Sequence, residues 1–135
     1  MNHTIIKQYQ EQIENLQAMG DPDLLYHWII DLGRQLQKNP LPEEKRHDLN
    51  RVSRCQYSLF VDLDEGNFKA WSDGLIASGY AFILTDIFNH LSPQEASKID
   101  PGFIFDSLDI GSILSMSRSN GFYQMIDMLK EKIKR

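Results

Sequence analysis

The sequence predicts an α+β protein in which helices pack around a small antiparallel sheet. Three observations predict this class. Apolar residues recur at helical spacing towards both ends of the chain, the spacing changes to alternation between Tyr57 and Leu63, and a turn signal follows directly. With 135 residues, 41% of them hydrophobic and 24% charged, the chain is expected to form one globular domain over residues 1–135.

Two helices are expected at the N-terminal end, packed as a hairpin. An apolar stripe at helical spacing predicts the first helix, and it consists of Ile5, Tyr9, Ile13 and Leu16. Gly20 is a natural stop, and a second helix then begins with Asp21 as N-cap and Pro22 at its first position. Two prolines exclude a regular helix from residues 39–47, which form either a mobile arm or an ordered approach to the cysteine.

Three short antiparallel strands are expected in the middle of the chain. The alternation from Tyr57 to Leu63 predicts the first arm of a hairpin. Asp64–Asn67 has the composition of a turn, and Phe68–Trp71 provides the second arm. A short strand around Leu49–Ser53 supplies the third member. Cys55 then lies in a loop between two strands, where we expect it to be exposed.

Helices are expected to cover this sheet in the C-terminal half. The segment Leu75–His90 is apolar almost all round, which predicts a central helix with Ser72 or Asp73 as its N-cap. Ser92–Glu95 matches a capping box and opens a short helix. Apolar residues at core spacing from Phe122 to Ile133 predict the last helix.

Composition argues against several classes of function. A net charge of −5 and an isoelectric point of about 5.3 argue against nucleic acid, because phosphate binding needs a basic face. No apolar stretch is long enough to span a bilayer and the N-terminal segment lacks a signal-peptide core, so no membrane association and a cytoplasmic location are expected. One cysteine and four histidines without zinc-ligand spacing predict no metal site. The sequence has neither a phosphate-binding glycine loop nor a nucleophile elbow.

Cys55 is the only cysteine, and it lies where a basic polar run meets the alternating segment. Because it cannot form an internal disulfide, any exchange must involve another molecule. The residues leave two interpretations open: a small buried hydrophobe, or a reactive thiol whose thiolate Arg51 and Arg54 would favour. A cysteine hydrolase is disfavoured because no histidine matches a catalytic signature. Asp62 and Asp64, next to a turn, are more typical of a solvated strand face than of a catalytic pair.

The order of these features resembles the SufE family of sulfur acceptors. Three blocks carry the resemblance: Asn50–Gln56 followed by Leu59-Phe60-Val61, Ser72-Asp73 followed by Ile76 and Gly79, and Leu114–Gly121. Order and spacing agree from about residue 20 to the C-terminus. Arg54 stands where the family usually has glycine, which changes the conformational freedom of the loop before Cys55.

The resemblance implies a SufE/IscU-like fold with a three-stranded sheet and a role in iron–sulfur cluster assembly. A SufS-type cysteine desulfurase would pass sulfane sulfur to Cys55 as a persulfide, and Cys55 would deliver it to a cluster scaffold. Pyridoxal phosphate belongs to that desulfurase, so this chain is expected to bind no cofactor of its own. The resemblance also implies that Asp73 and Arg118 position the loop or dock the desulfurase, while Arg51 and Arg54 support the thiolate or the loop. A monomer that docks transiently is the expected state.

Two alternatives and one structural hypothesis accompany this interpretation. The chain would otherwise be a diverged module that binds the desulfurase or scaffold without carrying sulfur, or a redox-sensing thiol protein. Since a persulfide is easily reduced or oxidised, the resting Cys55 should be sheltered against apolar side chains and swing out on docking.

Overall fold

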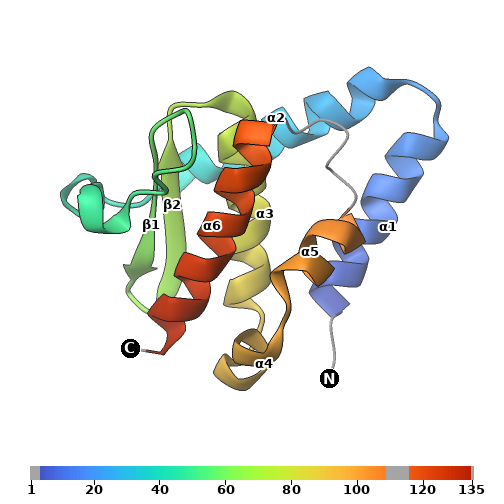
Figure 1. The fold of residues 1–135 in the computed structure, drawn as a ribbon. Coiled ribbons are helices and arrows are strands. Elements are labelled where there is room, and N and C mark those ends of the chain that lie inside the picture. Colours follow the sequence, from blue (N-terminus) through green and yellow to red (C-terminus); the bar gives the residue numbers. More distant parts are fainter. Residues whose placement is uncertain (1–3, 109–115, 135) are drawn as a thin grey trace.

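The computed structural model of the protein describes residues 4–108 and 116–134, and the side chains of residues 4–108 and 119–134. Its regular elements are α1 (Thr4–Ala18), α2 (Pro22–Lys38), β1 (Leu59–Asp64), β2 (Asn67–Ser72), α3 (Leu75–Asn89), α4 (Pro93–Lys98), α5 (Pro101–Leu108) and α6 (Met116–Ile133). Short 3₁₀ turns, η1 at Glu43–Lys45 and η2 at Asp48–Asn50, precede β1. Figure 1 shows α3 at the centre, with the β1–β2 hairpin on one side and α1 and α5 on the other.

The first two helices form where the sequence predicts them. Ile6, Tyr9 and Ile13 are the buried residues of α1. Gly20 lies between α1 and α2 and has a φ of +79°, a left-handed conformation that costs glycine little. The Asp21 carboxylate then accepts a hydrogen bond from the Asp23 amide at 3.0 Å, which confirms the predicted N-cap of α2.

The central hairpin also follows local sequence signals. β1 and β2 pair antiparallel in a register that runs from Leu59 opposite Ser72 to Asp64 opposite Asn67. The two turn residues, Glu65 and Gly66, have φ values of 53° and 85°, as a two-residue type I′ connection requires. Leu59, Val61, Phe68 and Ala70 share the buried face and contribute to the core. The predicted alternation is therefore confirmed within the strand.

The prediction of a third strand is wrong for the described part of the chain. The segment predicted as that strand, Leu49–Ser53, instead begins inside a 3₁₀ turn and contributes one isolated bridge, between Arg51 and Phe60. The side chain of Asn50 explains the difference, because its amide donates to the carbonyl of Lys45 at 2.8 Å and closes the turn. Extended pairing therefore stops after a single position.

The central helix α3 packs against α2 with their backbones in contact. A Cβ added at Gly79 would collide with the carbonyl of Ile29, and one added at Gly33 would lie 2.9 Å from the Cβ of Ser78. The absence of a side chain at Gly79 therefore lets the backbone of α2 approach α3 closely. α3 is buried on nearly all sides, as its apolar sequence indicates.

The two helix starts that the sequence predicts after the hairpin have different outcomes. Gly74 is the N-cap of α3, so the prediction of Ser72 or Asp73 at that position is wrong. Asp73 does not cap the helix because its carboxylate accepts from the Ser58 amide on the neighbouring chain segment instead. At α4 both hydrogen bonds of the capping box between Ser92 and Glu95 are present, and this prediction is confirmed.

Candidate functional site

Cys55 lies in a short loop, residues 53–58, whose beginning is fixed in the core. We call this segment the cysteine loop. Just before it, the Val52 amide donates to the carbonyl of Leu59 at 2.8 Å, and both side chains are fully buried. The Cys55 amide donates back to the Val52 carbonyl at 3.2 Å, so the chain turns sharply towards the interior. The loop is therefore a compact projection from the start of β1.

The thiol is buried, contrary to the exposed position expected from the sequence. Cys55 is only 4% exposed. Its Sγ accepts a hydrogen bond from the hydroxyl of Tyr80 on α3 at 3.4 Å. A Cβ added at Gly121 on α6 would lie 3.3 Å from the Cβ of Cys55 and 2.9 Å from the Tyr80 hydroxyl oxygen. The loop turns inward because the bare backbone at Gly121 leaves room for it between α3 and α6.

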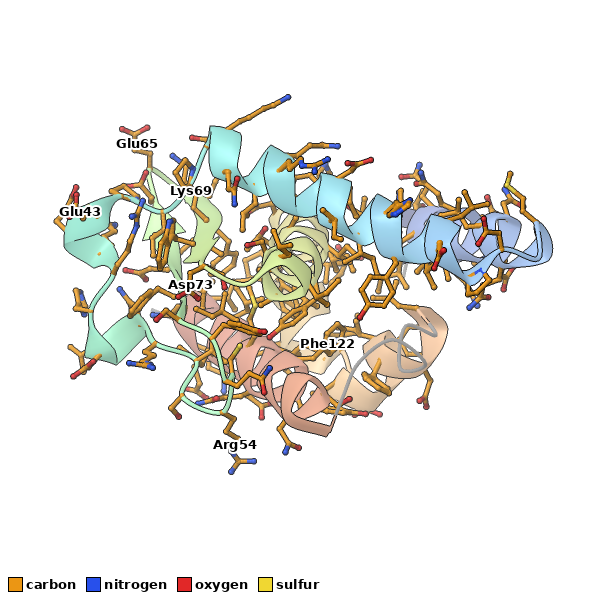
Figure 2. All side chains as sticks on the ribbon, turned by 90° about the horizontal axis from the view of Figure 1, so that it is seen from above. Glu43, Arg54, Glu65, Lys69, Asp73 and Phe122 are labelled. Atoms are coloured by element: carbon orange, nitrogen blue, oxygen red, sulfur yellow. The ribbon has the colours of Figure 1, made fainter. Side chains whose placement is uncertain are left out.

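Aromatic rings adjoin this space. The rings of Tyr80 and Phe122 lie 5.8 Å apart, and Phe105 of α5 meets Phe122 edge-on at 5.5 Å. Figure 2 shows Phe122 directed into the body of the molecule from α6. We call the space beside Tyr80 and Gly121 that Cys55 occupies the thiol socket. The socket shelters the sulfur in an apolar setting, as the hypothesis about the resting state requires.

The tip of the cysteine loop is held by one neutral side chain of α6. Oε1 of Gln124 accepts from the Arg54 amide at 2.7 Å, and its Nε2 donates to the Ser53 hydroxyl at 3.0 Å. Gln124 lies three residues after Gly121 and thus on the same face of the helix. One face of α6 therefore supplies both the space for Cys55 and the clasp that keeps the loop over it.

Asp73 holds the other end of the loop. Its carboxylate accepts from the Ser58 amide at 2.9 Å, and its own amide donates to the Ser58 carbonyl at 3.3 Å. Because Leu59 pairs with Ser72, these bonds continue the hairpin by one residue beyond the strands. The end of the cysteine loop is consequently fastened to β2, with Asp73 itself exposed.

The three predicted arginines occupy different places. Arg51 and Arg54 are exposed, and within the described residues neither guanidinium forms a hydrogen bond or ion pair. Figure 2 shows Arg54 pointing away from the body of the molecule. Arg118 lies in the first turn of α6, one turn before Gly121, and its side chain is outside the described part of the structure. In this resting arrangement the Arg54 cation is directed towards solvent rather than towards the thiol.

A buried charged cluster fixes the chain before the cysteine loop. Lys132, 3% exposed, donates to Oδ1 of Asn50 at 2.6 Å and pairs with Oδ1 of Asp62 at 3.3 Å. The amide of Asn50 also donates to the second oxygen of Asp62 at 3.2 Å. Burial alone would raise the pKa of Asp62, but the Leu63 amide and the Lys132 charge outweigh it and lower that pKa. We call Asn50, Asp62 and Lys132 the base cluster.

The sequence-based interpretation missed the roles of Asp62, Lys132, Tyr80 and Gln124. Asp62 was expected on a solvated strand face and instead belongs to the base cluster with Lys132. Tyr80 offered a signal, because a tyrosine in an almost wholly apolar helix needs a partner for its hydroxyl. Gln124 offered a weaker one, namely its helical spacing from Gly121.

Two other kinds of feature are absent from the described residues. Among the residues with a described position, no group of three or more His, Cys, Asp or Glu side chains is arranged to hold a metal ion. No helix in that same part of the chain has the length and apolar character needed to cross a membrane.

Comparisons with known proteins place this geometry in context. The family model described as "SufE: Fe-S metabolism associated domain" matches residues 10–133. An uncharacterized SufE-like protein from Synechocystis sp. is 28% identical over 135 residues, covering 97% of this chain and 83% of that protein. The solution structure of a hypothetical protein from Thermus thermophilus superposes with a TM-score of 0.74 at 19% identity, covering 99% of this chain and 96% of that one. The last likeness concerns the fold alone.

Proposed function

The chain belongs to the SufE family, whose domain is associated with iron–sulfur metabolism, and we propose that its part in that metabolism is to carry sulfur on Cys55. The donor in this proposal is a SufS-type cysteine desulfurase that holds a persulfide on its own cysteine. The Cys55 thiolate attacks the outer sulfur of that persulfide. One S–S bond forms on Cys55 as the other breaks, and the desulfurase cysteine leaves as a thiolate. No external oxidant or reductant is needed.

The placement of Cys55 carries the proposal. It is the chain's single cysteine, it lies on a loop fastened at both ends, and its sulfur is kept in an apolar socket. A thiol that serves only as packing needs no such loop, whereas a persulfide needs protection from reduction and oxidation between two protein encounters. Transfer to an iron–sulfur scaffold would repeat the same exchange with Cys55 as the donor.

Reaction with the desulfurase requires the sulfur to leave the socket. At 4% exposure the thiol cannot meet the cysteine of another protein in the resting arrangement. The tip is held by the bonds to Gln124 and by the Tyr80–Cys55 contact, and none of these involves an ion pair. In the proposed cycle, docking of the desulfurase replaces these bonds and the cysteine loop swings outward.

The charged residues around the loop take supporting roles in this proposal. Asp73 keeps the end of the loop on β2 while the tip moves. Arg51 and Arg54 lie on the exposed side, where they can favour the thiolate after it emerges and can meet acidic groups of the desulfurase. Arg118, one turn before Gly121, is proposed to dock the desulfurase or to hold the loop. Pyridoxal phosphate remains with the desulfurase.

Intact-mass analysis tests the proposal directly. After incubation with a cognate cysteine desulfurase and L-cysteine, the protein should gain the mass of one sulfur atom, and a reductant should remove it. Cys55→Ser should gain nothing, whereas Asp127→Ala, a change to an exposed residue of α6, should gain sulfur as the unmodified protein does. Absence of the adduct on the unmodified protein would refute sulfur carriage.

Measuring how strongly the protein stimulates the desulfurase tests the alternative function that Arg54 favours. Arginine in place of the usual glycine changes the loop that faces a partner, which would suit a module that binds a desulfurase without accepting sulfur. If the protein is such a module, its Cys55→Ser variant should still stimulate the desulfurase fully. A sulfur carrier would lose that stimulation with the thiol. Oxidation of Cys55 by peroxide without transfer from the desulfurase would instead indicate a redox sensor.

A further inference from the structure

A second candidate site lies in a crevice among α1, α2 and α3, and no residue of the cysteine loop contributes to it. The crevice has a volume of about 530 Å³, which falls in the range of small-molecule sites. Three aromatic side chains line it, one from each helix: Tyr9, Trp28 and Phe82. The rings of Tyr9 and Trp28 lie 6.3 Å apart at 59°. We call this space the α1–α3 crevice.

The charged side chains that line the α1–α3 crevice are both acidic. Asp31 and Asp86 contribute carboxylates, and among the described lining residues there is no lysine, arginine or histidine. Asp86 accepts a hydrogen bond from the Tyr9 hydroxyl at 2.5 Å. Burial, this hydrogen bond and the Asp86 charge together raise the pKa of Tyr9, which keeps its hydroxyl a donor. The arrangement holds a fixed negative charge beside aromatic surface.

The cations that approach from outside are poor competitors for this charge. Arg34 pairs with Asp31 at 2.8 Å, but both side chains are more than 60% exposed, and such pairs contribute little. The ring of His90 lies 3.2 Å from Asp86, and because the His90 side chain is 60% exposed, water weakens this pair as well. A ligand cation inside the crevice would therefore add a charge that the protein does not itself provide there.

We propose that the α1–α3 crevice binds a small organic cation, an amidinium, guanidinium or amine carried on a flat apolar body. The cationic head pairs with Asp86, and Asp31 adds attraction. The apolar body lies against Trp28 and Phe82, where cation–π attraction and apolar burial act together. Gln35, also in the lining, offers a polar side chain for orientation.

Titration with benzamidine, followed by ¹H–¹⁵N correlation spectra, tests this proposal. The chain has two tryptophans, so Trp71→Phe leaves the Trp28 indole as the single reporter. The indole signal should shift and saturate with a dissociation constant of about 1 mM, as suits so small a ligand. Benzamide, the neutral isostere, and benzoate, the anion, should bind at least about tenfold more weakly because neither offers a cation to Asp86.

Matched variants show whether the carboxylate is responsible. Asp86→Asn retains an acceptor for the Tyr9 hydroxyl, so the fold should persist while benzamidine binding weakens about fivefold or more. Glu14→Gln removes an exposed carboxylate of α1 outside the crevice and should leave binding unchanged. Equal shifts with benzamidine and benzamide, or unaltered binding by the Asp86→Asn protein with its spectrum otherwise preserved, would overturn the proposal.

Discussion

Two of the attachments that hold the chain around Cys55 differ in their chemistry. Before the loop, the base cluster joins η2, β1 and α6. Lys132, which is 3% exposed, forms an ion pair with Asp62 and donates a hydrogen bond to the side-chain amide oxygen of Asn50. At the tip, Gln124 makes two neutral hydrogen bonds near the surface, and Tyr80 makes one long contact to sulfur. Both attachments reach α6, yet the first is buried and charged while the second is neutral and partly exposed.

This difference determines which part of the loop can move at low cost. Separating the base cluster would leave an ammonium group and a carboxylate without partners, a large penalty away from water. Releasing the tip exchanges neutral protein bonds for bonds to water, and each typically contributes only about 1 kcal/mol net. A swinging cysteine on a fixed base is therefore the motion that the contacts favour, and four predictions examine this contrast.

The largest expected effect comes from removing the charge of the base cluster. Lys132→Met preserves much of the side-chain volume but removes the cation that contacts Oδ1 of Asn50 and Oδ1 of Asp62. The change should lower the free energy of unfolding by about 3 kcal/mol. Urea denaturation would measure this. Lys134→Met is the matched control, since its pair with Glu131 is exposed and its loss should cost less than about 0.5 kcal/mol. Equal effects of the two changes would show that the base is no stronger than a surface contact.

Filling the thiol socket should have the next largest effect. Glycine to alanine within a helix normally stabilises a protein by up to about 1 kcal/mol. At Gly121 the new methyl would press on the Tyr80 hydroxyl and Cys55, so we expect destabilisation of about 1–2 kcal/mol instead. The displaced thiol should also react faster with iodoacetamide.

Gly102→Ala in α5 provides the control for this change. A Cβ there would lie 3.4 Å from a carboxylate oxygen of Asp100, an ordinary contact, so stability should stay the same or rise. If Gly121→Ala behaved like Gly102→Ala and left the alkylation rate unaltered, Cys55 would not depend on the space at Gly121.

The sequence predicted the elements that depend on neighbouring residues. The alternation in β1, the turn at Glu65-Gly66 and the caps at Asp21 and Ser92 all arise from chemistry within a few positions. The same local logic failed for Leu49–Ser53, because alternation cannot reveal that Asn50 closes a turn on Lys45. The extended pairing there was lost to one side-chain hydrogen bond.

The burial of Cys55 could not be predicted from its own segment. The polar residues around it indicate exposure, and the two residues on each side of Cys55 are themselves exposed. The thiol lies instead against the Tyr80 hydroxyl, 25 residues away in the sequence, and beside Gly121 of α6, which has no side chain to fill the space. The clasp made by Gln124 spans 70 residues to Arg54, beyond the reach of any periodic pattern. Resemblance to a family identified the cysteine, but only the fold shows how it is held.

Opening the clasp should change reactivity more than stability. Gln124→Ala removes the bonds to Ser53 and Arg54, so the tip should open more often, and iodoacetamide should alkylate Cys55 about five- to tenfold faster. The free energy of unfolding should fall by less than about 1 kcal/mol, because the base cluster remains intact. Asp127→Ala, on the same helix, should alter neither quantity. An unchanged alkylation rate in Gln124→Ala would mean that the clasp does not control access to the thiol.

The smallest expected effect concerns pH and tests whether Asp62 contributes as an anion. The fold lowers the pKa of Asp62: burial opposes the shift, and the Leu63 amide and Lys132 outweigh it. A carboxyl with a lowered pKa stabilises the fold fully above its unfolded pKa of about 3.9, and this contribution disappears as pH falls through the folded pKa. The urea midpoint should therefore decrease below about pH 4, and the midpoint of the Asp62→Asn protein should decrease less steeply.

Since Asp64 also has a lowered pKa, through its bond to Lys69, the difference between the two proteins isolates Asp62. Parallel pH profiles would show that the carboxylate of the base cluster contributes through its shape and hydrogen bonds rather than its charge, which would weaken the contrast between base and tip.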